Sequence, residues 1–189
     1  NLLIRLLFYL DKITGKKTVP NYKIEIPELF VNKAKELMPN DKRYIGFSIT
    51  AGHPTRVKEI SMQEIIKVAN YYSGEFVPTF FIEDKYLEIK KLLKKEVTNA
   101  FFPEEILEKK LKKPIMVTAM GRLTEFNVSI DNGISHMLSY SNSKNYIFFN
   151  KSAEKFRPSN NSAIYDCEKT NKNIDTLTSD EIINFINNN

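Results

Sequence analysis

The sequence predicts an α/β domain in which helices cover both faces of a parallel sheet. From about residue 44 onward, short apolar and β-branched runs alternate with longer segments of helical periodicity. The short runs are almost continuously apolar, which is typical of strands that are buried on both faces. The chain has 189 residues, of which 42% are hydrophobic and 27% charged, so it can bury one core of ordinary size.

The first 43 residues predict a lead-in to this domain. Leucines recur at helical spacing and predict an amphipathic helix over 1–13, but Arg5 interrupts its apolar run, which is too short to span a bilayer. Gly15, Pro20 and Pro27 indicate an irregular linker, and a helix is predicted over 28–38. We therefore divide the chain into a lead-in, residues 1–43, and a domain, residues 44–189.

Within the domain, periodicity and local signals predict each element in turn. Strands are predicted over 43–50, 75–82, 126–130, 145–149 and 162–167, with a short strand at 98–102. Helices are predicted over 61–72, 83–96, 103–113, 114–125, 132–141 and 178–186.

Caps and prolines support these boundaries. Ser61 and Glu64 have the spacing of a capping box, and Thr178 or Ser179 is a suitable N-cap for the last helix. Pro78 predicts a bulge or a strand end. The alternation of strands and helices predicts a Rossmann-like layered arrangement.

In such sheets, ligands bind outside the carboxyl ends of the strands. Asp131, Asn132 and Gly133 follow the strand 126–130. Gly133 allows a sharp turn or a close approach to a ligand, and the next helix would direct free N–H groups at a phosphate. His136, one turn later, would donate to the same anion, whereas a carboxylate at Asp131 would accept from sugar hydroxyls. The same residues also suit an ordinary helix cap with a surface histidine.

Two further strand ends carry polar residues. Donors and basic groups follow the first strand, at Thr50, His53, Thr55, Arg56 and Lys58. They suit a diphosphate, with Lys58 as a mobile point charge, although a solvated basic loop has the same composition.

Glu83 follows the second strand, where a carboxylate accepts from ribose hydroxyls in nucleotide-binding folds. A helix N-terminal acid is the alternative. Three polar loops at three strand ends favour a shared ligand site more than any one of them does.

Composition narrows the function classes. The sequence contains no glycine-rich dinucleotide fingerprint, no Walker-type phosphate loop and no nucleophile elbow. One cysteine, Cys167, and two histidines argue against a disulfide framework or a zinc site, so we expect no metal cofactor. The net charge of +5 favours phosphate-bearing partners, although many lysines stand beside glutamates in helical patterns typical of a solvated surface.

The loops resemble those of one family. The segment "SIDNGISHML" is similar to the Asp-Thr/Ser-Gly-x-x-His element of the heptosyltransferase-like glycosyltransferases (family 9), in the C-terminal, donor-binding half of their two-domain GT-B fold. "IGFSITAGHPTRVKEIS" and "FFIEDK" resemble the loops of that family that carry a lysine and an acid, and "IDTLTSDEIINFI" resembles its closing helix. The resemblance covers about Tyr44 to Ile186. Asn132 replaces the usual Thr or Ser, and Ile134-Ser135 replace Pro-Met.

The resemblance implies a role for each matching residue. Lys58 and the helix start at Gly133 would hold the diphosphate of a nucleotide sugar such as ADP-heptose, with His136 assisting. Glu83 would hold the ribose, Asp131 the transferred sugar, and Thr50, Thr55 and Arg56 are additional candidates for donor contacts. The implied reaction is a metal-independent displacement with inversion at the anomeric carbon, in which preorganised donors stabilise the leaving diphosphate.

The resemblance also implies partners outside this sequence. The catalytic base and the site for a glycan or glycolipid acceptor would lie in an N-terminal domain of the same enzyme, so the chain, which begins with Asn, is expected to be a fragment. We expect lipopolysaccharide or related surface-glycan assembly, on the cytoplasmic face of the inner membrane with peripheral contact, and no nucleic-acid partner. The alternatives are a non-catalytic α/β module that binds a nucleotide or a protein, and a GT-B relative such as a sugar-nucleotide epimerase.

Overall fold

The computed structural model describes residues 2–19, 23–51, 59–154, 158 and 162–189. Its centre is a five-stranded sheet in which every pairing is parallel and the strand order is β2-β1-β3-β4-β5. The strands are β1 Tyr44–Ser48, β2 Val77–Phe80, β3 Thr124–Ile130, β4 Lys144–Phe149 and β5 Ser162–Asp166. The predicted α/β class and the Rossmann-like parallel sheet are confirmed.

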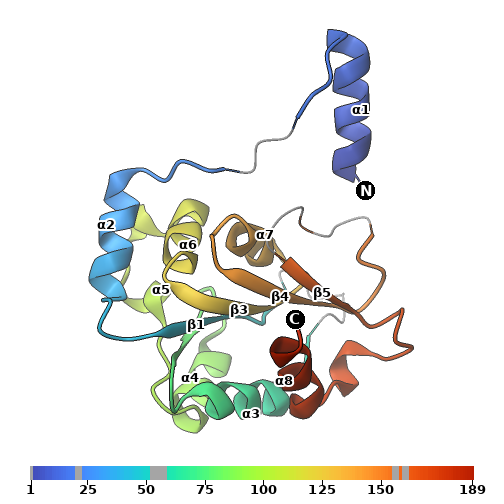
Figure 1. The fold of residues 1–189 in the computed structure, drawn as a ribbon. Helices are drawn as coiled ribbons and strands as arrows, with labels where there is room; N and C mark the ends of the chain where they lie inside the picture. Colours follow the sequence, from blue (N-terminus) through green and yellow to red (C-terminus); the bar gives the residue numbers. More distant parts are fainter. Residues whose placement is uncertain (1, 20–22, 52–58, 155–157, 159–161) are drawn as a thin grey trace.

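Helices pack on both faces of this sheet (Figure 1). The α-helices are α1 Leu2–Thr14, α2 Glu28–Leu37, α3 Met62–Tyr72, α4 Leu87–Glu96, α5 Pro103–Ile106, α6 Pro114–Gly121, α7 Gly133–Ser139 and α8 Ser179–Asn187. Two short 3₁₀ segments, η1 Lys109–Leu111 and η2 Ile174–Thr176, complete the described elements. Helices α3, α4 and α8 cover one face, and α2, α6 and α7 cover the other.

Alternation along the strands builds one large buried core on each face of the sheet, and a third, smaller cluster forms around Ile147 and Phe149. In β1, the side chains of Ile45 and Phe47 enter the core beneath α3, α4 and α8, while Tyr44 enters the core beneath α2 and α6. Helix α2 therefore contributes to a core of the domain although it precedes the sheet in sequence. In contrast, α1 stands apart from the sheet in Figure 1 and exposes apolar side chains such as Phe8 and Ile13.

Several predicted boundaries are corrected. The segment 98–102 forms only a single parallel bridge, between Phe101 and Thr79, and β3 begins two residues earlier than expected. The helix predicted over 103–113 is instead the short α5 followed by η1, because the backbone is extended at Leu107, which lets Leu107 and Leu111 both pack into the core beneath α2 and α6. Tertiary packing here overrides local helical preference.

Two helix starts also differ. Helix α4 begins at Leu87 and not at Glu83, which leaves residues 83–86 as a turn. Ser61 precedes α3, but its side chain makes no capping hydrogen bond, and the Glu64 N–H donates instead to the Ser61 carbonyl at 3.0 Å. The Glu64 carboxylate does not return to Ser61, because it accepts from the Lys67 ammonium at 2.7 Å and the Ser179 N–H at 2.6 Å. The expected capping box at Ser61 is therefore wrong, and Glu64 instead ties α3 to the start of α8.

Pro78 lies within β2 without a bulge. Its register partner is Ile45 of β1, and β2 is the edge strand of the sheet, so a ladder donor is not needed on its outer side. The irregularity in the sheet lies instead between Tyr44 and Ile45, where β1 pairs with β3.

Candidate functional site

A pocket of about 520 Å³ opens where β1, β2 and β3 end. Each of these strands contributes the residues that follow it: Thr50 after β1, Glu83 after β2, and Asn132 with Gly133 after β3. The other walls come from the connection between α5 and α6 and from α6 and α7. The lining residues are Thr50, Ile82, Glu83, Asp84, Glu104, Lys112, Lys113, Pro114, Val117, Asn132, Gly133, Ile134 and Met137.

Asn132 joins two of these strand ends. Its side-chain oxygen accepts from the Ser135 N–H at 2.8 Å, which caps α7, and its amide nitrogen donates to Ser48 Oγ at 2.8 Å and to the Thr50 carbonyl at 3.1 Å. The capping role belongs to Asn132 and not to Asp131. Because its amide already binds protein groups, Asn132 shapes the pocket mainly by holding α7 against the end of β1.

Gly133 opens α7 at the edge of the pocket. Its φ is not in the positive range, and a Cβ placed on it would meet nothing within 4 Å. The sharp-turn explanation for this glycine is therefore wrong, and open space in front of its backbone remains. The N–H groups of Gly133 and Ile134 precede the first intrahelical hydrogen bond of α7, so they can bind a ligand acceptor.

Buried hydrogen bonds between the sheet and α7 hold this helix in place. The Asn145 amide nitrogen, which is fully buried on β4, donates to the Ser135 carbonyl at 2.9 Å and to Ser139 Oγ at 3.1 Å. Its oxygen accepts from Ser129 Oγ of β3 at 2.9 Å. These bonds hold the helix start in a defined position relative to the strand ends, as a preorganised site requires.

The turn between β2 and α4 brings two acids to the pocket. Glu83 forms an ion pair with the Lys85 ammonium at 2.8 Å, and its side chain is half exposed. Asp84 lies between two ammonium groups, Lys112 at 2.6 Å and Lys90 at 3.2 Å. The hydrogen bond from Lys112 holds the pKa of Asp84 below its ordinary value, so the aspartate stays ionised.

Glu104 is the third acid of the pocket and differs from the other two. It is partly buried on α5, and within the described part of the chain it has no hydrogen bond or ion pair. Burial raises its pKa, with the charges of Asp84 and Glu83 acting in the same direction and those of Lys112 and Lys90 against it.

The structure brings together only some of the predicted site residues. Thr50, Glu83, Asn132 and Gly133 line one pocket. Asp131 and His136 adjoin Asn132 and Gly133 in sequence, but neither is a lining residue of that pocket. Asp131 is partly buried at the end of β3, and His136 is partly exposed on α7.

Lys58, Thr55, Arg56 and His53 lie outside the described residues, which end at Ala51 and resume at Glu59. The two ends of this loop are close together, because the Ala51 N–H donates to the Glu59 carboxylate at 2.9 Å. The Tyr86 hydroxyl donates to the Ala51 carbonyl at 2.8 Å and so holds the loop base beside the turn that carries Glu83.

Sequence reasoning missed the wall formed by Glu104, Lys112 and Lys113. These residues lie in "PEEILEKKLKKP", whose lysines and glutamates are typical of a solvated helix. Lys112 and Lys113 stand directly before the helix-starting Pro114, but Lys-Lys pairs such as Lys90-Lys91 occur elsewhere, so no local signal set this segment apart.

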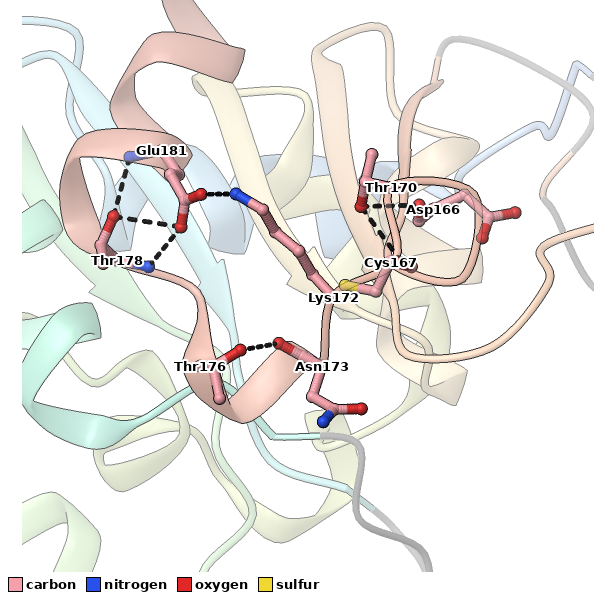
Figure 2. A network of polar contacts seen from close by, with 8 residues as sticks. All are labelled: Asp166, Cys167, Thr170, Lys172, Asn173, Thr176, Thr178 and Glu181. Atoms are coloured by element: carbon pink, nitrogen blue, oxygen red, sulfur yellow. Dashed lines mark hydrogen bonds and ion pairs between the residues drawn. The ribbon is translucent and has the colours of Figure 1, made fainter.

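A second polar network, none of whose residues lines this pocket, fixes the end of the domain (Figure 2). The Thr178 hydroxyl and the Glu181 carboxylate form a capping box at the start of α8, and Lys172 forms an ion pair with Glu181. Cys167 lies beside this network and is fully buried, and burial raises the pKa of its thiol to about 11. The thiol is therefore a packed core group and not a nucleophile.

Over the described residues, no cluster of three or more histidine, cysteine, aspartate or glutamate side chains is arranged to hold a metal ion. Over the same residues, every helix is too short or too polar to cross a bilayer.

Comparison with known proteins gave matches among solved structures only. No family model matches the sequence. No curated protein matches it either.

The glycosyl transferase family 9 structure from Veillonella parvula DSM 2008 has a TM-score of 0.71 and 16% identity, over 88% of this chain and 52% of that one. E. coli heptosyltransferase WaaC with ADP-2-deoxy-2-fluoro heptose has a TM-score of 0.68 and 15% identity, over 94% of this chain and 52% of that one. E. coli ADP-heptose lps heptosyltransferase II has a TM-score of 0.71 and 12% identity, over 91% of this chain and 54% of that one.

The chain shares the fold of these glycosyltransferases. The predicted resemblance is thus confirmed at the level of fold, and the chain spans about half the length of the solved relatives it matches. WaaC has been solved with ADP as well as with the fluorinated ADP-heptose.

Proposed function

We propose that this chain is the nucleotide-sugar-binding half of an inverting glycosyltransferase similar to the family 9 heptosyltransferases. The observation that carries the proposal is the convergence of Thr50, Glu83, Asn132 and Gly133, from three strand ends, on one pocket. The fold is shared with heptosyltransferases, two of whose structures contain ADP or an ADP-sugar, and this supports a nucleoside diphosphate sugar as the ligand of the pocket.

In this proposal the donor lies along the pocket. The Glu83 carboxylate accepts from the ribose hydroxyls, and the N–H groups of Gly133 and Ile134 donate to the diphosphate. Lys58 supplies a positive charge to the same diphosphate, with Thr55, Arg56 and His136 as further donors. Asp131 accepts from hydroxyls of the transferred sugar.

The chemistry follows from these positions. An acceptor hydroxyl attacks the anomeric carbon, the bond to the diphosphate oxygen breaks, and the nucleoside diphosphate leaves with the electron pair. Backbone N–H groups and Lys58 stabilise the growing negative charge, and a single such donor contributes about 100-fold to 1,000-fold in rate in comparable sites. This scheme needs no metal.

The other parts of the enzyme belong to the same proposal. The general base and the glycan or glycolipid site reside in a preceding domain, and the whole enzyme assembles lipopolysaccharide or a related glycan at the cytoplasmic face of the inner membrane. The chain alone binds the donor and transfers little sugar. The competing hypothesis, a non-catalytic α/β module with ordinary caps at its strand ends, predicts no nucleotide binding.

Ligand-induced stabilisation tests the proposal. A dissociation constant of about 100 μM and about 1 mM ADP would stabilise the chain by about 1.4 kcal/mol, which raises Tm by roughly 3–6 °C for a domain of this size. Lys58→Ala and Asp131→Ala, measured with ADP-heptose, should remove most of the shift. Lys91→Ala is the control, because Lys91 is an exposed helix lysine that pairs with Glu88 and does not line the pocket. No shift with any nucleoside diphosphate at millimolar concentration would overturn the proposal.

A further inference from the structure

Glu104 is the acid of the pocket whose hydrogen-bonding capacity is unused. Among the described residues, Asp84 is held by Lys112 and Lys90, and Glu83 by Lys85, whereas Glu104 has no hydrogen bond and no ion pair. An ionised carboxylate has two oxygens that accept only, and it is costly to bury without donors.

Among the described residues, no side chain or backbone group donates a hydrogen bond to Glu104. Lys112, the neighbouring ammonium that acts most strongly on its pKa, directs its hydrogen bond at Asp84, at 2.6 Å. Burial outweighs these positive charges and leaves the pKa of Glu104 above its ordinary value. A partly buried carboxylate without a donor is stabilised more by a hydrogen bond from a ligand N–H than an exposed glutamate is.

The position of Glu104 assigns it to one end of the ligand. Gly133 and Asn132 form the α7 side of the pocket, and Glu83 follows β2. Glu104 comes from α5, and with Lys112 and Lys113 it forms the side built by the α5–α6 connection. A nucleoside diphosphate with its phosphates at Gly133 and its ribose at Glu83 therefore directs its base toward Glu104.

The pocket also offers apolar surface to a flat ring. Carbon-rich side chains from the segment after β2 and from α6 and α7 line it beside these acids. They are Ile82, Pro114, Val117, Ile134 and Met137. A base can bury its faces against such side chains, and a polar group at its edge then decides which base is accepted.

We infer that Glu104 is a specificity-determining residue that accepts a hydrogen bond from the exocyclic amino group of the donor's base. The inference rests on the proposed function. It makes the pocket selective for bases with an amino group at this edge, such as adenine and cytosine, over their oxo counterparts. An oxo base turns carbonyl lone pairs toward Glu104. An ionised carboxylate repels these lone pairs and has no proton to donate to them.

Two matched pairs of nucleotides test this inference by isothermal titration calorimetry on the full 189-residue chain. ADP and inosine diphosphate differ by amino against oxo on a purine, and CDP and UDP differ in the same way on a pyrimidine. In the pair that binds more tightly, the amino member should bind about 10-fold to 100-fold better, the range for one hydrogen bond to a charged group.

Glu104→Gln should remove this preference. The Gln amide can donate to a carbonyl and accept from the adjacent ring N–H of an oxo base, or flip to accept from the amino group and donate to the ring nitrogen of an amino base, so it suits both. Glu104→Ala should abolish the preference in both pairs. Glu105→Gln is the matched control, because Glu105 is the next residue on α5 but pairs with Lys94 and does not line the pocket. It should keep the preference of the unaltered chain.

The outcomes separate this inference from the function on which it rests. If nucleoside diphosphates bind but amino and oxo members bind equally, Glu104 does not select the base. The same conclusion follows if the preference survives in both Glu104 variants. If none of the four nucleotides binds, the proposed function fails, and this inference fails with it.

Discussion

The substitution Gly133→Ala should have opposite effects on the stability of the domain and on its affinity for ADP. Gly133 begins α7 with an ordinary helical backbone, and a methyl group there would meet no protein atom within 4 Å. Alanine therefore fits without strain and restricts the unfolded chain, which should stabilise the protein by about 0.4–1 kcal/mol. The same methyl group projects into the space in front of the helix start, where the proposed diphosphate lies.

The expected loss of affinity follows from the contacts that the methyl group displaces. Losing one hydrogen bond between a backbone N–H and a charged phosphate oxygen costs about 1.5–3 kcal/mol, so ADP should bind about 10-fold to 100-fold more weakly. Urea unfolding with and without ADP measures both effects on one sample. The variant should have the higher free energy of unfolding without ADP and the smaller gain when ADP is added.

Gly74→Ala is the matched control. Gly74 lies in the turn after α3, a methyl group there also meets nothing within 4 Å, and the residue does not line the pocket. It should leave ADP binding unchanged. Unchanged ADP affinity in Gly133→Ala would refute the placement of the phosphates at α7, and a loss of stability would refute the account of its backbone.

Three further predictions concern stability. Gly46→Ala should destabilise the chain by about 1–3 kcal/mol in urea unfolding, because the new Cβ would lie 2.0 Å from Asn127 Oδ1 in the buried sheet; a loss no larger than that of Gly74→Ala would contradict this. Thr178→Ala should cost about 1 kcal/mol through loss of the α8 cap, and Thr178→Ser should retain most of it. Because the pKa of Asp84 is held below 3.8, its stabilising contribution is present above that pH and is lost as pH falls through the lower folded value. The stability difference between Asp84→Asn and the unaltered chain should then be seen at neutral pH and vanish at strongly acidic pH, and a difference that does not change with pH would exclude this account.

Local sequence signals were sufficient to predict those elements whose structure depends on neighbouring residues. The apolar runs at β1, β3 and β4 and the periodicity of α3 and α8 predict those elements, because strand and helix periods are written in neighbouring residues. The cap at Thr178 was predictable for the same reason. The predicted capping box at Ser61 did not form, and its Glu64 carboxylate binds instead to the Ser179 N–H, 115 residues away along the chain.

The candidate site divides in the same way. Thr50, Glu83 and Gly133 were predictable because a parallel sheet places the carboxyl ends of its strands at one edge. Glu104 and Lys112 were not, because they reach the pocket through a connection whose path depends on how Leu107 and Leu111 pack.

The sequence by itself therefore determined the class of fold, the alternation of its elements and the strand ends that line the pocket. These depend on interactions between neighbouring residues and on the geometry common to all parallel sheets. Only the tertiary structure decided which acid of the pocket has no hydrogen-bond partner among the described residues and which backbone faces open space. Those properties arise from side chains that are distant in sequence, and Asp84, Glu104 and Gly133 acquire them only when the core has packed.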